Sequence, residues 1–384
     1  MQYKTIGEIC TVVSGTTPRS DKAEYWGGNL IWITPAELKE GNAVIYDSVR
    51  HITKAAVKAS ALKPFPKGTV ILSSRAPIGK VAIAGTKMYC NQGFKNLICS
   101  EAIYNGYLYY YLKAKTAYLN SLGRGATFRE ISKQIVEEIK IPVPSMQEQH
   151  RIADILFKID ALMGKRQQQA EKLDELVKAR FVEMFGDPVL NCQGFPVRTI
   201  GELTTEVKYG TSKPAVEGGK YPYLRMNNLT IDGKLDLHDL KQIDVDTSEF
   251  EKCVVRKGDV LFNRTNSAEL VGKTAYYGLD EEMIIAGYII RVRVNNLILP
   301  QYLSFYMNMP FMKQRIRSMA KGAVNQANIN SKELKSIKVI VPPLEVQGKV
   351  VEYEERIDRE KDRIQRSAAL LETLKRSLMQ QYFG

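Results

Sequence analysis

The sequence has few of the side chains that most often hold metals or form disulfides. Its 384 residues include three histidines, far apart at positions 51, 150 and 238, and five cysteines without a C-x-x-C pair. An odd set of cysteines without paired spacing indicates neither a disulfide framework nor a zinc site. We therefore expect a reduced protein that binds no metal.

Long apolar runs are also missing. No run approaches the roughly 18 residues that a membrane-spanning helix needs. The first ten residues, MQYKTIGEIC, lack the charged and then apolar layout of a signal peptide. We expect a cytoplasmic protein, and its hydrophobic content of 44% is that of an ordinary globular chain.

Acidic residues are fewer than basic ones. The chain has 42 Asp and Glu against 55 Lys and Arg, which gives a net charge of +13 and a pI near 9.3. Such an excess favours a polyanionic partner such as nucleic acid, although a basic surface that binds nothing is the plain alternative. A chain of 384 residues also exceeds the usual size of one hydrophobic core, so two or more domains are expected.

The motifs of the enzymes that act on DNA or nucleotides are absent or incomplete. An adenine methyltransferase needs an N/D-P-P-F/Y loop, and the one P-P pair, VPPL at 341–344, lacks the polar first residue. The string SAELVGKT at 267–274 ends like a Walker A loop but has Ser267 in place of the first glycine. The E-x-K string EVK at 206–208 is short enough to arise by chance. We therefore expect that this chain catalyses nothing.

What the sequence does contain is an internal repeat. KTIGEI at 4–9 returns as RTIGEL at 198–203, and later matches keep the same order with offsets between 190 and 198. These are SGTTP (14–18) with YGTSKP (209–214), IWITPAEL (31–38) with PYLRMNNL (222–229), KGTVILSSR (67–75) with KGDVLFNRT (257–265), IGKVAI (78–83) with VGKTAY (271–276), QGF (92–94) with AGY (286–288), GYLYYYLKA (106–114) with QYLSFYMNM (301–309), GRGATFREISKQIVEEIKIPVP (123–144) with AKGAVNQANINSKELKSIKVIVP (320–342), and EMFG (183–186) with QYFG (381–384). The chain is a tandem duplication.

Each copy has a mixed part followed by a long helix. Short apolar runs such as GTVILSS and MIIAGYIIRVRV predict strands, and 106–121 and 301–319 predict helices. The segments 146–185 and 344–383 contain no internal proline and predict helices of roughly 60 Å. The fold class is therefore α+β, with two similar mixed α/β domains separated by two long antiparallel helices and related by a pseudo-two-fold repeat.

The two long helices carry an apolar seam. Apolar residues recur at the three-four spacing of a coiled coil, which we expect to pair the helices as a spacer between the domains. Ser145 with Glu148 forms a capping-box pattern at the first helix start. The seam residues are Ile152, Leu156, Ile159, Met163, Leu173, Val177, Val350, Ile357, Ile364, Leu371 and Leu378.

The helix starts resemble a known family. IKIPVPSMQEQHRIADIL at 139–156 and IKVIVPPLEVQGKVV at 337–351 are similar to conserved regions of type I restriction-modification specificity subunits, as are the openings TIGEI…SGTTP and TIGEL…YGTSKP. The second copy departs from the first in having Gly348 where the first has His150. The resemblance implies target recognition domains at 1–144 and 197–342, spacer helices at 145–185 and 343–384, and a linker at 186–196.

The resemblance also implies partners. In that family each recognition domain reads one half of a split double-stranded DNA site, and the helices dock two modification subunits. Those subunits bind S-adenosylmethionine and methylate adenine, and restriction subunits use ATP and Mg. This chain would bind none of these cofactors. The alternative is a two-headed coiled-coil adaptor between proteins, without DNA specificity.

Candidate DNA contacts are polar residues in loops flanked by glycine, because Arg, Lys, Asn and Gln pair with base edges. A solvated turn residue is the plain alternative for each. Glycines 15, 125, 210 and 322 are interpreted as turn formers. The candidates in the first domain are Thr16, Thr17, Arg19, Arg75, Asn91, Gln92, Arg124, Thr127 and Arg129, and those in the second are Thr211, Ser212, Lys213, Arg225, Asn227, Asn228, Asn263, Arg264, Asn325, Gln326 and Asn328.

Overall fold

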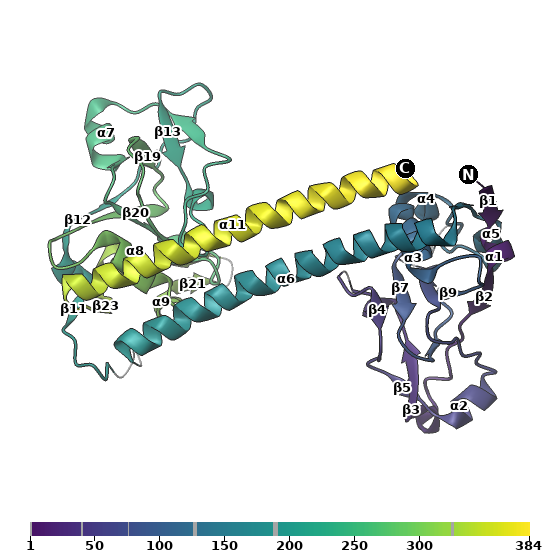
Figure 1. The fold of residues 1–384 in the computed structure, drawn as a ribbon. Coiled ribbons are helices and arrows are strands. Elements are labelled where there is room, and N and C mark those ends of the chain that lie inside the picture. Colours follow the sequence, from purple (N-terminus) through teal and green to yellow (C-terminus); the bar gives the residue numbers. More distant parts are fainter. Residues whose placement is uncertain (1, 40, 76, 126–128, 187–190, 324–325) are drawn as a thin grey trace. The chain divides into compact units, whose positions relative to one another are not determined.

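The chain forms two compact units. The computed structural model describes residues 2–39, 41–75, 77–125, 129–186, 191–323 and 326–384 (Figure 1). One unit contains Met1–Gln169 with Arg363–Gly384, and the other contains Ala170–Asp362. We call residues 2–143 the first head and residues 197–341 the second head, and both long helices contribute to both units.

The described residues of the first head form three sheets. Their strand orders are β2-β9-β6-β7-β4, β5-β3-β8 and β1-β10. The strands are β1 (Gln2–Thr5), β2 (Cys10–Ser14), β3 (Trp26–Ile33), β4 (Val44–Ile45), β5 (His51–Ile52), β6 (Val70–Ser73), β7 (Val81–Ala84), β8 (Tyr89–Cys90), β9 (Phe94–Cys99) and β10 (Lys140–Val143). The helices are α1 (Ile6–Ile9), η1 (Ala23–Tyr25), η2 (Pro35–Glu37), α2 (Lys54–Ala59), α3 (Asn105–Ala114), α4 (Thr116–Ser121) and α5 (Lys133–Glu138).

The second head repeats this arrangement. Its sheets have the orders β12-β20-β16-β18, β14-β13-β19-β15, β17-β22-β21 and β11-β23. The strands are β11 (Val197–Thr199), β12 (Thr204–Tyr209), β13 (Tyr221–Leu224), β14 (Lys241–Ile243), β15 (Val254–Val255), β16 (Val260–Asn263), β17 (Thr265–Asn266), β18 (Thr274–Tyr276), β19 (Met283–Ile285), β20 (Ile289–Val294), β21 (Lys321–Ala323), β22 (Gln326–Asn328) and β23 (Lys338–Ile340). The helices are η3 (Ile200–Leu203), η4 (Met226–Asn228), α7 (Thr247–Cys253), α8 (Pro300–Asn308), α9 (Pro310–Met319) and α10 (Ser331–Ser336).

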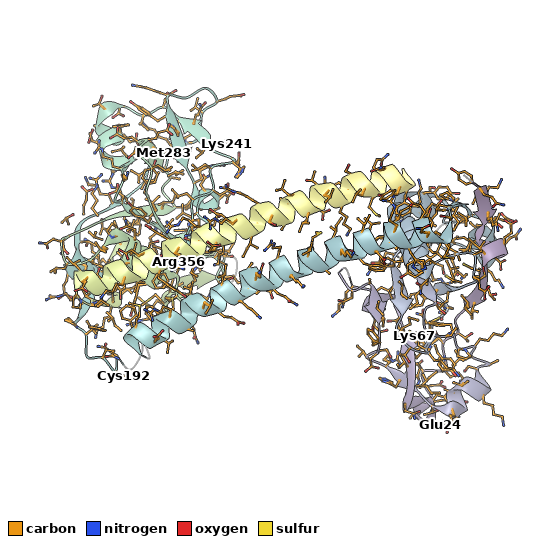
Figure 2. All side chains as sticks on the ribbon, in the orientation of Figure 1. Glu24, Lys67, Cys192, Lys241, Met283 and Arg356 are labelled. Carbon is orange, nitrogen blue, oxygen red and sulfur yellow. The ribbon has the colours of Figure 1, made fainter. Side chains whose placement is uncertain are left out.

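The topology of the two heads shows the duplication directly. The strand order β2-β9-β6-β7 matches β12-β20-β16-β18, and the parallel pair β3–β8 matches the parallel pair β13–β19. The first strand of each head pairs antiparallel with the last, as β1 with β10 and β11 with β23. Buried side chains fill the interior of each head (Figure 2). The repeat predicted from the sequence is confirmed.

The two long helices predicted from the sequence are also present, as α6 (Met146–Phe185) and α11 (Leu344–Phe383). At the start of α6 the Ser145 hydroxyl accepts a hydrogen bond from the Glu148 backbone N–H at 3.3 Å. The Glu148 carboxylate binds Arg151 at 2.6 Å, so the predicted capping box is only half made.

The sequence also predicts one shorter helix before each long helix, and in the structure each of these is divided into two helices. The predicted helix 106–121 divides at Lys115 into α3 and α4, and 301–319 divides at Met309 into α8 and α9. Pro310 explains the second break, because proline lacks the N–H that would continue the ladder and favours the first helical position.

Within each unit α6 and α11 run antiparallel. In the first unit Arg151 lies 5.8 Å from the Tyr382 ring, and Asp160 binds Lys375 at 2.6 Å further along α6. In the second unit Asp174 pairs with Lys361, and Arg180 lies 6.0 Å from the ring of Tyr353. Residues that advance along α6 therefore meet residues that recede along α11. These residues are Arg151, Asp160, Asp174 and Arg180 on α6, and Tyr382, Lys375, Lys361 and Tyr353 on α11.

The predicted seam has a second role. All eleven seam residues are buried or half-buried, but Ile152 and Leu156 belong to the core of the first head and Val350 to that of the second. The ends of the stripe therefore attach helices to heads rather than only to each other. The spacing of apolar residues could not separate these two uses, because both bury the same helix face.

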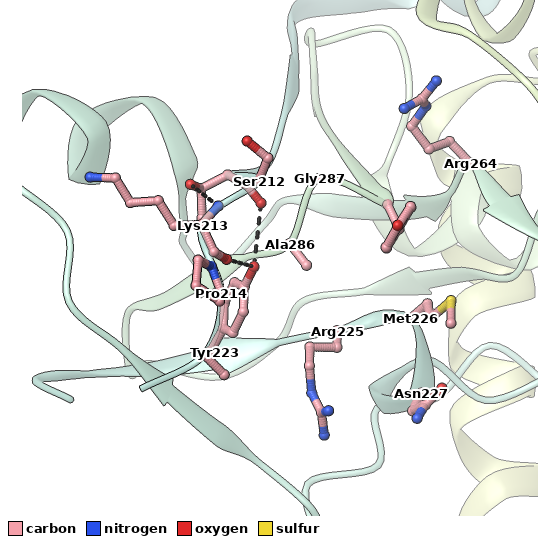
Figure 3. A pocket seen from close by; sticks show the side chains of 13 residues that line it. Ser212, Lys213, Pro214, Tyr223, Arg225, Met226, Asn227, Arg264, Ala286 and Gly287 are labelled. Carbon is pink, nitrogen blue, oxygen red and sulfur yellow. Dashed lines mark hydrogen bonds between the residues drawn. The ribbon is translucent and has the colours of Figure 1, made fainter. Parts of the chain in front are cut away.

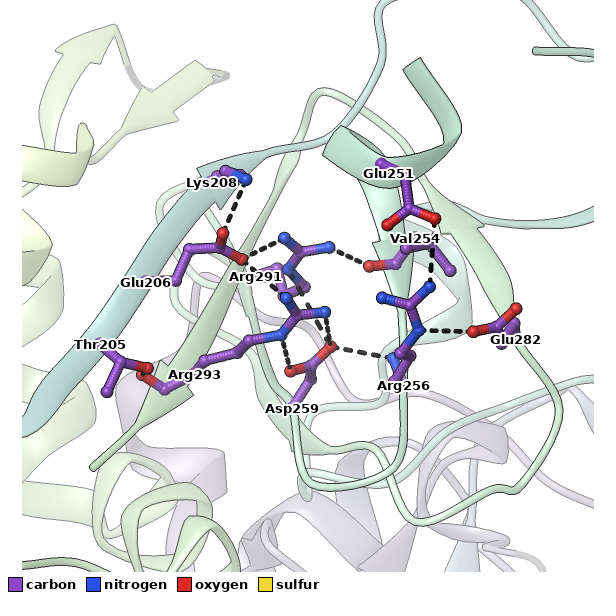
Figure 4. Close-up of polar contacts among 10 residues, drawn as sticks. All are labelled: Thr205, Glu206, Lys208, Glu251, Val254, Arg256, Asp259, Glu282, Arg291 and Arg293. Atoms are coloured by element: carbon purple, nitrogen blue, oxygen red, sulfur yellow. Dashed lines mark hydrogen bonds and ion pairs between the residues drawn. The ribbon is translucent and has the colours of Figure 1, made fainter. Parts of the chain in front are cut away.

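A buried charge network joins two sheets of the second head (Figure 4). Arg291 on β20 is fully buried, pairs with Glu206 on β12, and donates to the Val254 carbonyl on β15. Arg293 donates to Asp259 at 2.9 Å and to Glu206 at 3.0 Å. Because an unpaired buried charge is costly, this network holds the two sheets in one arrangement.

Candidate nucleic-acid interface

In the first head a glycine brings the loop after β2 against the end of β8. Thr16 N–H donates to the Cys90 carbonyl at 3.0 Å, and the Trp32 indole donates to the Thr16 carbonyl at 3.1 Å. A Cβ on Gly15 would lie 2.1 Å from the Asn91 carbonyl oxygen, so only glycine fits.

The second head builds the same loop. Thr211 N–H donates to the Ile285 carbonyl at 2.9 Å, and the Tyr223 hydroxyl donates to the Thr211 carbonyl at 3.3 Å. A Cβ on Gly210 would lie 2.1 Å from the Ile285 oxygen. Neither this glycine nor Gly15 has a φ in the left-handed region. Close backbone approach, rather than the turn dihedral expected from the sequence, therefore requires glycine at both positions.

This loop forms one wall of a pocket of about 580 Å³ in the second head (Figure 3). Tyr223, Met226 and Tyr288 contribute apolar surface, and Arg225 and Arg264 extend in opposite directions from its edge. The structure brings together six of the predicted contacts here. They are Thr211, Ser212, Lys213, Arg225, Asn227 and Arg264.

Two of the three cations at the pocket are paired with carboxylates. Lys213 pairs with Glu249 and lies 3.4 Å from Asp246, and Arg225 binds Asp239 at 2.8 Å. A hydrogen bond from Lys213 contributes most to holding the pKa of Glu249 below its usual value. These pairs keep both cations in place but reduce the positive charge they present.

Arg264 is held differently. Its guanidinium donates to the Asn328 side chain at 3.0 Å and lies over the Tyr209 ring, 4.9 Å from the centroid. In the described part of the chain no carboxylate lies within 4.0 Å of it, and its buried Nε has no hydrogen-bond partner. The predicted contact Gln326 is exposed on the neighbouring strand β22.

Two predicted contacts instead hold the backbone. Asn228 is buried, accepts from the Arg225 N–H at 2.8 Å and donates to the Asp236 carbonyl at 2.8 Å. Asn263 is fully buried and donates to the Thr265 carbonyl at 3.1 Å. Their amides are committed inside the protein, so they shape the pocket from behind.

In the first head several candidates are paired with neighbouring side chains. Thr17 donates to the side chain of Gln92. Arg75 binds Glu130 at 2.9 Å, and the same carboxylate binds the buried Lys95 at 3.1 Å. At the corner that corresponds to the position of Arg264, two cations therefore share one carboxylate.

Of the other candidates of the first head, Arg124 lies beside Glu130, because its N–H donates to the Glu130 carbonyl at 3.0 Å. Arg19 is exposed and binds Asp21 at 2.7 Å. The Asn91 side chain accepts a backbone N–H at 3.0 Å. Arg124 and Arg129 are exposed on the segment that leads to the last strand.

Sequence reasoning missed an aromatic cluster in the first head and two tyrosines in the second. The Arg50 guanidinium lies 3.8 Å from the centroid of the Trp26 ring and 5.3 Å from that of Trp32. Tyr209 and Tyr288 contact or line the pocket of the second head. The sequence could have indicated the aromatic cluster of the first head, because the chain's two tryptophans are six residues apart.

Two of the predicted contacts, Thr127 and Asn325, lie outside the residues that the structure describes. Among the described residues no group of three or more His, Cys, Asp or Glu side chains could hold a metal ion. No helix within those same ranges is long and apolar enough to cross a membrane.

The class of protein defined by this fold is a tandem pair of mixed α/β heads, each followed by a long helix. The family model for the type I restriction modification DNA specificity domain matches residues 1–172 and again residues 194–375. The chain belongs to this family.

Curated relatives agree. The type I restriction enzyme MjaIX specificity subunit of Methanocaldococcus jannaschii is 37% identical over 59% of this chain, and the alignment covers only 57% of that relative. The EcoKI specificity subunit of Escherichia coli is 24% identical over 94% of this chain and 82% of its own length. The crystal structure of a type I S subunit from M. genitalium has a TM-score of 0.61 at 18% identity, covering 100% of this chain and 96% of the other. That structure shows the same fold.

Proposed function

We propose that this chain is the DNA specificity subunit of a type I restriction-modification complex. The observation that carries the proposal is that one scaffold occurs twice with different side chains at the same loop. Two similar heads with different surfaces suit a bipartite asymmetric site, with each head reading one half.

Base-edge contacts at the pocket of the second head would supply part of the specificity, and lysines and arginines around each head would supply affinity through phosphates. Half-sites approached from one face of B-DNA lie about 10 bp apart, or a multiple of that distance. The net charge of +13 supports a DNA partner.

The paired helices would act as the spacer and as the platform for two modification subunits. Five leucines on their described residues are exposed by 45% to 71%, which is unusual for large apolar side chains on helices that are otherwise polar outside. They are Leu162, Leu176, Leu344, Leu370 and Leu374. Covering these leucines with partner helices would remove apolar surface from water.

The chemistry would belong to the partners. We propose that S-adenosylmethionine, ATP and Mg bind to the modification and restriction subunits, and that this chain is not catalytic. Lys273, at the end of the string that resembles a Walker A loop, is buried and donates to the Met226 carbonyl at 2.6 Å. It is therefore committed to holding a loop rather than a nucleotide phosphate.

The test is a map of methylated adenines in DNA from cells that make this chain with its modification subunit. Control cells make the modification subunit alone. A split motif that requires this chain would establish the function and identify both half-sites. Co-purification of the two proteins with no motif would contradict DNA specificity and favour the adaptor reading, which predicts no salt-sensitive binding to DNA.

A further inference from the structure

Arg264 has a structural counterpart in the first head. Ser74 N–H donates to the Gly93 carbonyl at 2.8 Å, and the Ser74 carbonyl accepts from Ile131 N–H at 2.9 Å. Ser74 and Arg264 directly follow corresponding inner strands of their sheets, β6 and β16.

Arg264 makes the same pair of backbone hydrogen bonds, one to the Tyr288 carbonyl and one from Ile329 N–H, each at 2.9 Å. The two backbones are thus held alike, and the difference between the heads at this point lies in the side chains. A hydroxymethyl group in the first head corresponds to a guanidinium in the second.

The side chain that accepts hydrogen bonds beside this position also differs between the two heads. Glu130 forms a bridge with Arg75, the residue after Ser74, just as Asn328 pairs with Thr265, the residue after Arg264. The first head therefore has a carboxylate where the second has a neutral amide. Asn328 can orient the guanidinium but cannot cancel its charge.

Arg264 is also preorganised. The Tyr209 ring supports one face of its guanidinium, and the Tyr209 hydroxyl itself accepts from Ser331 N–H at 2.7 Å. One bond to Asn328 uses one of the five guanidinium donors, which leaves both Nη atoms able to donate to a ligand. A charged, planar and fixed fork at the edge of a pocket suits an acceptor pair in one plane.

We propose that Arg264 is a base-specificity residue of the second head and donates a bidentate pair of hydrogen bonds to O6 and N7 of a guanine in the second half-site. Guanine is the base that presents two acceptors in the major groove, which is why arginine pairs with it most often. The first head, with Ser74 at this position, does not read a guanine in this way. The inference rests on the proposed function and adds to it the residue and the base.

The experiment compares methylation maps made by the full chain and its modification subunit. Arg264→Ser installs the residue of the first head, and Arg264→Lys keeps the charge but removes the fork. We expect both variants to lose a guanine preference of roughly 5- to 150-fold at one position of the second half-site. The first half-site remains unchanged.

Lys257→Ser is the matched control, because Lys257 belongs to the same head, is exposed and pairs with Asp280 outside the pocket. It removes the same charge and leaves the motif unchanged. Retention of the guanine by Arg264→Ser would overturn the inference, as would an equal loss of methylation at every site, which marks a phosphate contact. Retention of the full guanine preference by Arg264→Lys would refute the requirement for the planar guanidinium fork.

Co-purification with the modification subunit checks folding, and if Arg264→Ser fails this check, Arg264→Lys decides. A wild-type chain that writes no split motif refutes the proposed function and this inference together. A wild-type motif with no guanine in the second half-site refutes the inference alone.

Discussion

Gln149 and Gln347 make the same three hydrogen bonds at the starts of the two long helices. The Gln149 side chain accepts from Tyr104 N–H at 2.8 Å and donates to the carbonyls of Ala102 and Pro144 at 3.1 and 3.0 Å. The partners of Gln347 are Leu299, Leu297 and Pro342, at 2.8, 3.0 and 2.8 Å. Both glutamines are buried, so each fastens its helix to the loop before α3 or α8 in the preceding head.

Gln149→Leu should lower the free energy of unfolding by roughly 2 kcal/mol or more, because it leaves buried backbone groups without partners. Gln147→Leu is the matched control, since Gln147 is exposed two residues earlier in the same helix. Urea denaturation measures both variants. Equal midpoints would contradict the fastening role of Gln149.

Phe383→Ala should destabilise the first unit by roughly 3–5 kcal/mol, the usual cost of deleting a buried ring. The Phe383 ring is buried and packs against Tyr107 at 5.4 Å and Tyr111 at 5.9 Å between centroids. Leu370→Ala, on the exposed side of the same helix, should change stability by less than about 0.5 kcal/mol. If the two substitutions had equal effects on unfolding, Phe383 would not complete the core.

A half-chain that ends at Gly186 should dimerise. Phe185, the repeat counterpart of Phe383, packs 6.1 Å from Tyr302 as Phe383 packs against Tyr107. In a half-chain dimer Phe185 of one copy can fill the site beside Tyr107 of the other. Sedimentation equilibrium should give a dimer, and the half-chain with its modification subunit should methylate a symmetric site. A stable monomer whose long helix pairs with nothing would contradict the antiparallel pairing.

Glu206→Gln should destabilise the second unit by roughly 3 kcal/mol at pH 7, because it removes the carboxylate that pairs with the fully buried Arg291 guanidinium. Burial acts to raise the pKa of Glu206, but hydrogen bonds from Lys208 and Arg291 outweigh it and lower the pKa below 4.5. Its contribution is therefore complete above about pH 4.5 and is lost as the pH falls through the lower folded value.

The variant should accordingly lose part of the stability gain that the wild type shows as the pH rises toward about 4.5. Urea denaturation at several pH values measures it. The exposed Glu281→Gln serves as a control. An unchanged pH profile in Glu206→Gln would show that the network does not depend on this carboxylate.

Two glycine substitutions should act in opposite directions. Gly210→Ala would place a Cβ 2.1 Å from a carbonyl oxygen and should cost about 2–3 kcal/mol. Gly164→Ala meets nothing within 4 Å in the middle of α6 and should stabilise the first unit by about 1 kcal/mol through helix propensity. Thermal unfolding would show a lower midpoint for the first and a higher one for the second.

The sequence was sufficient for the repeat and the long helices, because both follow from periodic patterns along the chain. The alignment of Trp32 with Tyr223 is confirmed in detail, since each donates to the carbonyl of the threonine after the glycine that both repeats contain. The match of QGF with AGY is wrong by one residue, because Gly93 and Tyr288 occupy the same position in their heads. A single-residue difference in loop length is invisible without the hydrogen bonds.

The site was harder to predict. Whether an asparagine faces solvent or caps a turn depends on segments distant in sequence, so Asn228 and Asn263 looked like surface contacts. The same reason hid the pairing of Lys213 with Glu249, 36 positions further along the chain. The composition of the loops predicted where the pocket of the second head lies. Which of its cations are paired with carboxylates could be seen only in the folded structure.

The reciprocal placement of Phe185 and Phe383 has a consequence for how such chains can diversify. Each of these phenylalanines lies at the end of one repeat and packs against tyrosines in the core of the other repeat's head. Because the phenylalanine and the tyrosines are alike in both repeats, a genetic crossover near Gly186 would introduce a foreign head and still leave a phenylalanine in each core. We expect one half-site to be inherited independently of the other, so that new target sequences arise by shuffling heads rather than by redesigning them.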